Sequence, residues 1–445
     1  MYARQPSGRL YRARTVLSWF LLAFLLAAPF VDIGGRPLML LNVLERRFVI
    51  LGVLFPPQDF HLAVLLALTA LVTLVLTTVV FGRIWCGWLC PQTVFMEMLF
   101  RKLEFLIEGS SEQQLRRDKA AWTAEKIVRR GFKHALFFAL SFGMANVFLA
   151  WIVGAPELRR IVTDPPAQHI TGLVAITMFS FVFYMVFMRF REQACVLACP
   201  YGRLMSALTD SRTITVTYDW RRGEPRGRLT KAVSGPDPAA PGDCVDCHQC
   251  VTVCPTGIDI RNGVQLECVN CTACIDACNG VMAKVGRPAG LIRLTSEDAV
   301  RTGRGRWVTP RAAAYATAWL LLAGTVGVLF AQRRDLDVLI LRQPGTLYTS
   351  VPGGEVANFY SVQALNRTGR TAAFTIGVAE PKGSAVMPVG PLGSVEPFGL
   401  LERRLILRVP RERLAGMSTH VTFTVHTADG ETQTIDSSFL GPAER

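Results

Sequence analysis

Five long apolar segments without any charged residue constrain this sequence more than any other feature. They contain no Lys, Arg, Asp or Glu and cover residues 16–31, 61–81, 134–154, 170–188 and 312–332. A helix needs about 20 residues to cross a bilayer core of ~30 Å, and each segment approaches or reaches that length. The segments therefore predict five transmembrane helices. We expect the first to be a retained anchor, because the residues that end it lack the small-residue pattern of a signal cleavage site.

The basic residues divide unevenly between the loops, and this predicts the orientation. With the N-terminus inside, 31 of the 48 Lys and Arg fall in the inner segments 1–14, 82–133 and 189–311. Only five fall in the outer loops 32–60 and 155–169. We therefore interpret the formal net charge of +14 as a sign of membrane orientation, and we expect no nucleic-acid partner.

One stretch between the first two apolar segments does not fit a simple loop. Residues 37–57 are apolar except for Glu45, Arg46 and Arg47. A sixth span there would invert everything that follows and spoil the charge asymmetry. We therefore expect an interfacial or re-entrant segment on the outer side.

All 12 cysteines fall into four groups before residue 279. Under the predicted orientation every thiol lies in or against the cytoplasm, where disulfides are rare. This excludes a disulfide framework and requires another use for the sulfur.

The last two groups form the strongest motif of the chain. C-x2-C-x2-C-x3-C occurs twice within 35 residues, which is the ligand pattern of a bacterial two-cluster ferredoxin. In that pattern the fourth Cys of each run binds the other cluster. The predicted ligands of the first [4Fe-4S] cluster are Cys244, Cys247, Cys250 and Cys278, and those of the second are Cys268, Cys271, Cys274 and Cys254. A pair of tetrahedral zinc sites is the alternative, since four thiolates also suit zinc.

The first two groups are C-x3-C-P motifs, one after the second apolar segment and one after the fourth. They supply Cys86, Cys90, Cys195 and Cys199, and we expect both pairs at the cytoplasmic membrane face. Proline favours the first position of a helix, so Cys90 and Cys199 are expected to precede new helices. Four thiolates suit a soft ion such as Cu(I), which makes these cysteines candidate catalytic residues and copper ligands. Thiol–disulfide exchange within each pair and two buried structural pairs are the alternatives.

The pattern of apolar and polar residues changes after residue 333. Short runs rich in β-branched and aromatic residues alternate with turn residues, which predicts a β-sandwich of immunoglobulin type. The fold class is thus a multi-domain membrane protein: a helical bundle with a cytoplasmic two-cluster ferredoxin insert and an exported β-sandwich. The expected parts are a membrane domain at 1–220 with four spans and both C-x3-C-P motifs, a linker at 221–243, a ferredoxin-type domain at 244–300, a fifth span at 311–332 and the periplasmic sandwich at 335–445.

Several motifs together resemble one family. They are Arg83-Ile-Trp-Cys86-Gly-Trp-Leu-Cys90-Pro, Ala194-Cys-Val-Leu-Ala-Cys199-Pro-Tyr-Gly-Arg203, the two ferredoxin runs and residues 281–293. This set resembles the cytochrome c oxidase accessory protein family CcoG, also called FixG or RdxA. The resemblance implies a bacterial inner-membrane oxidoreductase that reduces Cu(II) to Cu(I) for assembly of cbb3-type cytochrome oxidase. It implies two [4Fe-4S] clusters, copper as substrate or bound ion, and copper-delivery and oxidase-assembly proteins as partners.

Our functional hypothesis is accordingly an electron-transfer enzyme. A cytoplasmic donor would reduce the clusters, and single electrons would pass to copper at the C-x3-C-P thiolates. Two rival hypotheses stay open: a quinol-linked ferredoxin-type subunit of an anaerobic respiratory chain, and a scaffold or copper chaperone whose clusters are structural.

Overall fold

The computed structural model describes residues 2–33, 36–43, 47–55, 59–228, 242–305, 308–345, 347–391, 394–428 and 430–442. The chain forms two compact units, residues 1–327 and 328–445, and each is described by itself. Within the expected linker 221–243, residues 229–241 lie outside the described residues.

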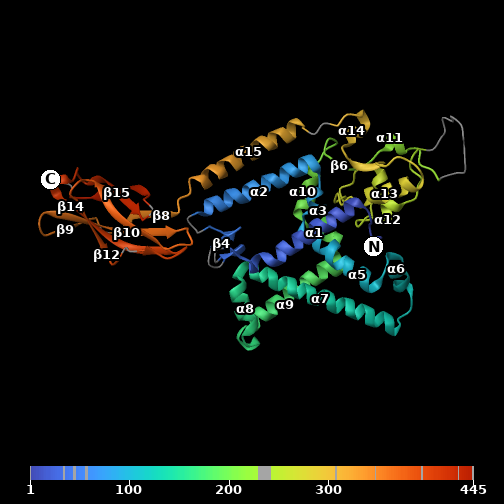
Figure 1. Ribbon diagram of the computed structural model, residues 1–445, viewed down its shortest axis with the longest axis horizontal. Helices are drawn as coiled ribbons and strands as arrows, with labels where there is room; N and C mark the ends of the chain where they lie inside the picture. The colour runs from blue at the N-terminus through green and yellow to red at the C-terminus, as the bar shows by residue number, and fades with distance from the viewer. Residues whose placement is uncertain are drawn as a thin grey trace. The chain divides into compact units, whose positions relative to one another are not determined.

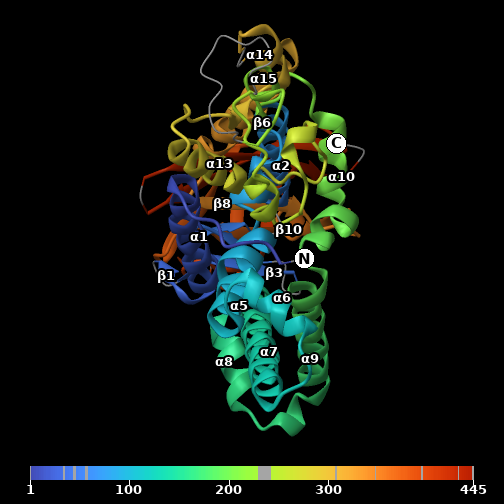
Figure 2. The ribbon, with the colours of Figure 1, turned by 90° about the vertical axis from the view of Figure 1, so that its right-hand side faces the viewer.

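Five helices of the described chain are long and apolar enough to cross a membrane, one at each predicted segment. They are α1 (Arg9–Ala27, extended by a 3-10 turn, Ala28–Phe30), α2 (Phe60–Phe81), α7 (Ala124–Val153), α9 (Ile170–Met185, extended by a π segment, Val186–Phe190) and α15 (Pro310–Ala331). Helix α7 begins ten residues before its apolar segment, because Thr123 caps it by accepting a hydrogen bond from the amide of Lys126. Helices α7 and α9 run side by side (Figures 1 and 2).

The segment between α1 and α2 contains no membrane-length helix among its described residues. It forms a short hairpin, β1 (Asp32–Ile33) with β2 (Arg36–Pro37), and a three-stranded antiparallel sheet of β3 (Met39–Asn42), β4 (Arg47–Ile50) and β5 (Val53–Phe55). Strand β3 packs on α7, near the end of that helix, where a Cβ on Gly154 would lie 3.6 Å from Leu40. The described residues of 37–57 therefore pair as strands, and their interfacial or re-entrant placement on the outer side stays a prediction.

Shorter helices follow the second and fourth spans. After α2 come α3 (Ile84–Trp88), α4 (Pro91–Thr93), a π segment (Val94–Phe100), α5 (Arg101–Glu108) and α6 (Ser111–Lys119). After α7 comes α8 (Ala155–Thr163), and after α9 come a second π segment (Ala194–Ala198) and α10 (Pro200–Leu208). The buried rings of Phe100 and Phe187 stack with centroids 4.5 Å apart, and Phe137 packs edge-on against Phe100 at 4.9 Å. These rings fix the helix that follows Cys90 to α7 and to the end of α9.

The cysteine-rich region between α10 and α15 has little regular structure. It contains β6 (Thr215–Tyr218), α11 (Trp220–Gly223), α12 (Gln249–Thr252), a 3-10 turn (Ile260–Asn262), α13 (Ala273–Lys284), β7 (Ile292–Thr295) and α14 (Glu297–Thr302). Strands β6 and β7 pair antiparallel, with Thr215 opposite Thr295. Strand β6, which lies in the expected membrane domain 1–220, therefore pairs with a strand of the expected ferredoxin-type domain 244–300, and we count it as part of the cysteine-rich module.

This module is attached to the ends of the first two spans. The amide of Arg4 donates to the carbonyl of Thr252 at 2.8 Å, so the residues before α1 lie against α12. Asn270 Nδ2 donates to the carbonyl of Phe81, the last residue of α2, at 3.1 Å. The start of α1 and the end of α2 therefore lie at one end of the bundle, as the predicted topology requires.

The second unit is built from two antiparallel sheets. One has the order β12-β14-β10-β8, with β9 also on β10, and the other has the order β13-β11-β15-β16. The strands are β8 (Leu336–Arg342), β9 (Thr349–Val351), β10 (Glu355–Asn366), β11 (Ala372–Glu380), β12 (Ala385–Val389), β13 (Ser394–Val395), β14 (Leu400–Pro410), β15 (Ser418–Thr427) and β16 (Thr432–Leu440). Alternating side chains of both sheets meet in a core that includes the fully buried Tyr360, Leu405 and Phe423. This is the predicted sandwich.

Candidate functional site

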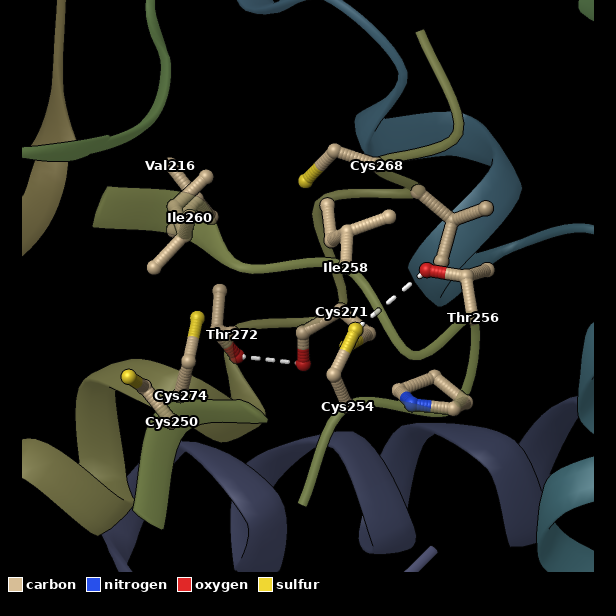
Figure 3. A pocket seen from close by; sticks show the side chains of 12 residues that line it. Val216, Cys250, Cys254, Thr256, Ile258, Ile260, Cys268, Cys271, Thr272 and Cys274 are labelled. Carbon is tan, nitrogen blue, oxygen red and sulfur yellow. Dashed lines mark hydrogen bonds between the residues drawn. The ribbon is translucent and has the colours of Figure 1, made fainter. Parts of the chain in front are cut away.

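Four of the eight predicted cluster ligands surround one cavity in the cysteine-rich module. Cys254, Cys268, Cys271 and Cys274 line this space together with Cys250. Figure 3 shows these side chains around the space, with Cys254 from the turn after α12 and Cys274 from the first turn of α13. This is the set of thiols that the spacing predicts for one cluster, and we refer to it as the inner cavity.

The other four predicted ligands surround a second cavity, the outer cavity. It is lined by Cys244, Cys247, Cys250 and Cys278 together with His248 and Arg261. Cys247 is exposed, so this cavity reaches the surface of the module. Because Cys250 lines both spaces, the two cavities are neighbours.

A buried cation borders the outer cavity. The side chain of Arg261 is only 3% exposed and donates hydrogen bonds to Asp259 at 2.6 Å and to Asp246 at 2.5 Å. Hydrogen bonds from Arg261 lower the pKa of both carboxyl groups. The pairs therefore hold a charge-paired guanidinium group beside the outer thiols.

The arrangement of the eight thiols favours clusters over zinc. Within the described residues, no three His, Cys, Asp or Glu groups converge as the ligands of a single metal ion must. A zinc ion with bonds of about 2.3 Å draws its four sulfurs together at one point, whereas a cubane fills space between them. Two neighbouring cavities, each lined by the four thiols that the spacing assigns to one cluster, fit the larger group.

Burial opposes ionisation of these thiols when no metal is present. It raises the pKa of Cys250 to about 11 and those of Cys268 and Cys278 to about 12. These three thiols are therefore protonated at neutral pH until iron displaces the protons, which couples cluster binding to proton release.

Of the C-x3-C-P cysteines, Cys90 and Cys199 immediately precede helices, as predicted. Cys86 is buried in α3, and Cys90 precedes α4 with an extended backbone at φ −64° and ψ 124°. Cys195 lies in the π segment before α10, and Cys199 immediately precedes Pro200 of that helix. π segments occur frequently at functional sites in proteins.

Ion pairs hold the two C-x3-C-P motifs together although they are 109 residues apart in the chain. Arg101, on the helix after Cys90, pairs with Glu192, which lies three residues before Cys195. Arg191 donates to Glu104 at 2.7 Å, and Lys133 of α7 lies 3.4 Å from the same carboxylate. Burial alone would raise the pKa of Glu104, but the charges and hydrogen bonds of Arg191 and Lys133 lower it.

The four C-x3-C-P thiols share one electrostatic neighbourhood. Burial raises the pKa of Cys195 to about 12, and the thiols of Cys90, Cys86 and Cys199 contribute in the same direction. The sequence-predicted thiol set is therefore brought together, although not into the arrangement of ligands around a single ion within the described chain.

The C-x3-C-P site adjoins the inner cavity. A Cβ on Gly87 would lie only 2.3 Å from the carbonyl oxygen of Val269 and 3.0 Å from the amide nitrogen of Cys271. Trp88 Nε1 also donates to the carbonyl of Asn270 at 3.2 Å. Helix α3, which carries Cys86, therefore touches the loop that carries two inner-cavity thiols.

Three residues that sequence reasoning did not single out make this junction. Gly87 permits the close approach, and the buried Asn270 joins the loop to α2 and accepts a hydrogen bond from the amide of Val216 in β6 at 3.2 Å. Arg83 donates to the carbonyl of Leu266 in the same loop. Their positions inside or beside cysteine motifs were the only signal, since each contact joins parts of the chain more than 50 residues apart.

Comparison with known proteins agrees with this geometry. A model described as a 4Fe-4S dicluster domain matches residues 190–297, and one described as a 4Fe-4S binding domain matches residues 63–108. A third, described as the IG-like fold at the C-terminal of FixG, a putative oxidoreductase, matches residues 326–442. These matches and the five apolar helices define an iron–sulfur electron-transfer protein of the multi-pass membrane type, with two [4Fe-4S] clusters and a C-terminal Ig-like domain.

Relatives identify the family. The chain is 35% identical over 400 residues to Protein RdxA of Cereibacter sphaeroides, covering 85% of this chain and 82% of that protein. It is 32% identical over 467 residues to the nitrogen fixation protein FixG of Rhizobium meliloti, covering 93% and 87%. The crystal structure of a FixG-related protein from Vibrio parahaemolyticus matches 24% of this chain and 97% of that one at 19% identity, with a TM-score of 0.20. The chain belongs to the FixG/RdxA family.

Proposed function

We propose that this protein is a cupric reductase that supplies Cu(I) for assembly of cbb3-type cytochrome c oxidase. The copper ion is the substrate: Cu(II) takes up one electron and becomes Cu(I), with no bond to carbon made or broken. The observation that carries the proposal is the contact between α3 and the inner-cavity loop through Gly87, Val269 and Cys271. It puts a set of soft ligands directly beside a redox-capable set.

The cysteine-rich module would hold the electron carriers. Cys244, Cys247, Cys250 and Cys278 would bind one [4Fe-4S] cluster and Cys254, Cys268, Cys271 and Cys274 the other. Bound there, the clusters supply one-electron oxidation and reduction. The exposed Cys247 makes the outer cavity the side at which a cytoplasmic electron donor would approach.

The C-x3-C-P residues would bind the substrate. Thiolates stabilise Cu(I) over Cu(II), so Cys86, Cys90, Cys195 and Cys199 would favour the reduced ion as well as hold it. Burial of Cys86 limits the access of water and of oxidants to its thiol. Because the thiols do not surround a single point, they would close around copper only when it binds.

The proposal also includes an orientation and partners. The N-terminus and clusters would be cytoplasmic, and the Ig-like domain periplasmic, in a bacterial inner membrane. The support is the distribution of basic residues between the loops. Copper-delivery and oxidase-assembly proteins would bind the Ig-like domain.

A four-cysteine variant tests the copper site. Replacing Cys86, Cys90, Cys195 and Cys199 by Ser keeps the side-chain size but removes the soft ligands, so we expect Cu(II) reduction by the dithionite-reduced protein to fall about tenfold or more. Anaerobic EPR and iron content provide the control and should show both clusters still present. Replacing the buried Met96 and Met98 by Leu provides a matched variant that removes soft sulfur nearby without removing a thiol. If the four-cysteine variant reduces Cu(II) at the normal rate, the proposed role of the thiols is wrong.

A further inference from the structure

One buried arginine lies between the C-x3-C-P thiols and the inner cavity. Arg83 follows α2 and is only 7% exposed. Its Nη1 donates to the carbonyl of Leu266, two residues before Cys268. Its Nη2 lies 3.1 Å from the place that a Cβ on Gly202 would take, and that place is 2.5 Å from the carbonyl oxygen of Cys195. The guanidinium group therefore reaches from the second C-x3-C-P motif to the inner-cavity loop.

Two nitrogens of this guanidinium group lack an acceptor within the described protein. Nε and Nη2 of Arg83 are buried and have no hydrogen-bond partner. Buried donors of a charged group are rarely left without an acceptor, because their loss of water is then uncompensated. Two such donors on one side chain indicate an acceptor that arrives with a metal.

The thiols around Arg83 are the acceptors within its reach. Its positive charge acts on Cys86, Cys195 and Cys268, and its side chain also donates a hydrogen bond to Cys86, in each case opposing the effect of burial on the pKa of the thiol. Two of these cysteines belong to the C-x3-C-P site and one to the inner cavity. Once metals convert the thiols to thiolates, each sulfur carries negative charge and accepts hydrogen bonds.

We propose that Arg83 is a positioning residue shared by both metal sites: its free N–H groups donate to the metal-bound thiolates of the C-x3-C-P site, and its charge stabilises the reduced inner cluster. The first half rests on the proposed copper function and the second does not. Hydrogen bonds to sulfur and nearby charge set the potential of an iron–sulfur cluster. A cation between two anionic metal–thiolate centres also offsets their mutual repulsion.

Arginine suits this position better than lysine does. Its planar group presents five N–H donors in a fixed fork and stays charged when buried, whereas a lysine offers one compact ammonium. A single lysine Nζ cannot reach Leu266 and the region of Gly202 at once. Arg83→Lys therefore keeps the positive charge but removes the forked set of hydrogen-bond donors.

The test uses the full-length protein with Arg83→Gln and Arg83→Lys. Midpoint potentials of both clusters are measured by anaerobic EPR redox titration without copper. We expect Arg83→Gln to move one cluster signal to a lower potential and leave the other in place, because only the inner cavity adjoins Arg83. We expect Arg83→Lys to restore most of the potential.

A second measurement addresses the thiol site. Cu(I) affinity is determined by competition with a chromogenic Cu(I) chelator, which involves no reduction step. We expect both variants to bind Cu(I) about 10–100-fold more weakly, the usual effect of removing an outer-shell hydrogen bond. Arg367→Gln in the β-sandwich, where the side chain is 9% exposed and bonded to Asp337 at 3.0 Å, is the matched buried-arginine control and should change neither quantity.

Unchanged potentials in both variants, or equal shifts of both cluster signals, would overturn the role of Arg83 at the inner cluster. If Arg83→Gln does not accumulate, Arg83→Lys alone decides: unchanged Cu(I) affinity would overturn the role at the thiols. A shifted potential with normal Cu(I) affinity and no Cu(II) reduction in the wild-type protein would reject the copper function while the role at the inner cluster remains.

Discussion

At the scale of single residues, the contact between the two metal sites depends on the absence of one side chain. Gly87 lies between Cys86 and Trp88, and its α carbon faces the backbone of residues 269–271. A Cβ at 2.3 Å from a backbone oxygen cannot be accommodated by rotating a flexible side chain. Helix α3 and the inner-cavity loop would have to separate, which makes Gly87 a direct probe of the distance between the sites.

We predict that Gly87→Ala slows Cu(II) reduction by about tenfold or more, since displacements of about 1 Å can reduce rates of this kind strongly. Both clusters should still assemble, because no predicted ligand is changed. The measurement is the rate of cluster reoxidation by Cu(II) after dithionite reduction. Gly143→Ala in α7, where a Cβ would have nothing within 4 Å, is the matched control and should react normally. A normal rate for Gly87→Ala would show that close contact at this point is not needed.

Among single residues, the cluster ligands can be predicted from the sequence, but the residues that join the two metal sites cannot. The division of the eight cysteines into two fours follows from the ligand pattern, since the cavity-lining sets are those that spacing predicts. The contributions of Gly87, Arg83 and Asn270 do not follow, because each depends on contacts with a loop about 180 residues later or with β6 and α2. No local pattern of apolar or polar residues encodes such contacts.

At the scale of secondary-structure elements, the first span is capped by another part of the chain. The residue before α1 is Gly8, which has no side chain to accept from the free amides of the first turn. The carboxylate of Asp276, on α13, accepts from the amide of Tyr11 at 2.8 Å and from that of Leu10 at 3.3 Å. The cysteine-rich module thus completes the end of a transmembrane helix.

We predict that Asp276→Ala destabilises this junction by about 0.5–2 kcal/mol, the usual cost of a lost cap. Asp276→Asn should cost less, because its amide oxygen still accepts one hydrogen bond. Amide hydrogen exchange of residues 9–13 is the measurement, and these amides should exchange faster in the Ala variant. Ser296→Ala removes the cap of α14, where Ser296 Oγ accepts from Ala299, and should leave residues 9–13 unchanged. Equal exchange in the wild type and Asp276→Ala would contradict the cap.

Sequence patterns predict elements in proportion to their length and regularity. The five spans and the strands of the sandwich core around Ile340, Val362, Ile376, Leu405 and Val425 lie where expected. The short or edge strands β9, β12, β13 and β16 were not predicted, because brief or polar strands carry little alternation. The π turn within residues 94–100 was also not predicted, since an amphipathic run indicates a helix but not its hydrogen-bond register.

At the scale of the whole molecule, three helix ends of the first unit are held by the cysteine-rich module or by α10, the helix that precedes it. The start of α1 is bound to the module through Arg4, and the end of α2 through Asn270. The start of α15 is bound to α10 through Arg311, which donates to the carbonyl of Ala207 at 3.2 Å. These ends fall on one side of a membrane only if two, or another even number, of crossings separate them. The described structure therefore agrees with the predicted order of crossings, and the basic residues predict that this side is cytoplasmic.

This orientation leads to the last prediction, which reporter fusions in a bacterial host test directly. Alkaline phosphatase folds only after export, so fusions at residue 122, between α6 and α7, should be inactive. Fusions at residue 166, between α8 and α9, and at residue 335, after α15, should be active. Green fluorescent protein at the same positions is the matched control and should give the reverse pattern, because it does not fluoresce when it is exported unfolded.

The physical reason is the number of arginines and lysines that would otherwise have to cross. Inversion would export the 31 Lys and Arg of residues 1–14, 82–133 and 189–311, whereas the predicted orientation exports five in the outer loops 32–60 and 155–169 and 12 after the fifth span. Active phosphatase at residue 122 with inactive phosphatase at residue 335 would show that the protein has the opposite orientation in the membrane. The clusters would then face the periplasm, and a cytoplasmic electron donor and the copper reaction proposed above would both be untenable.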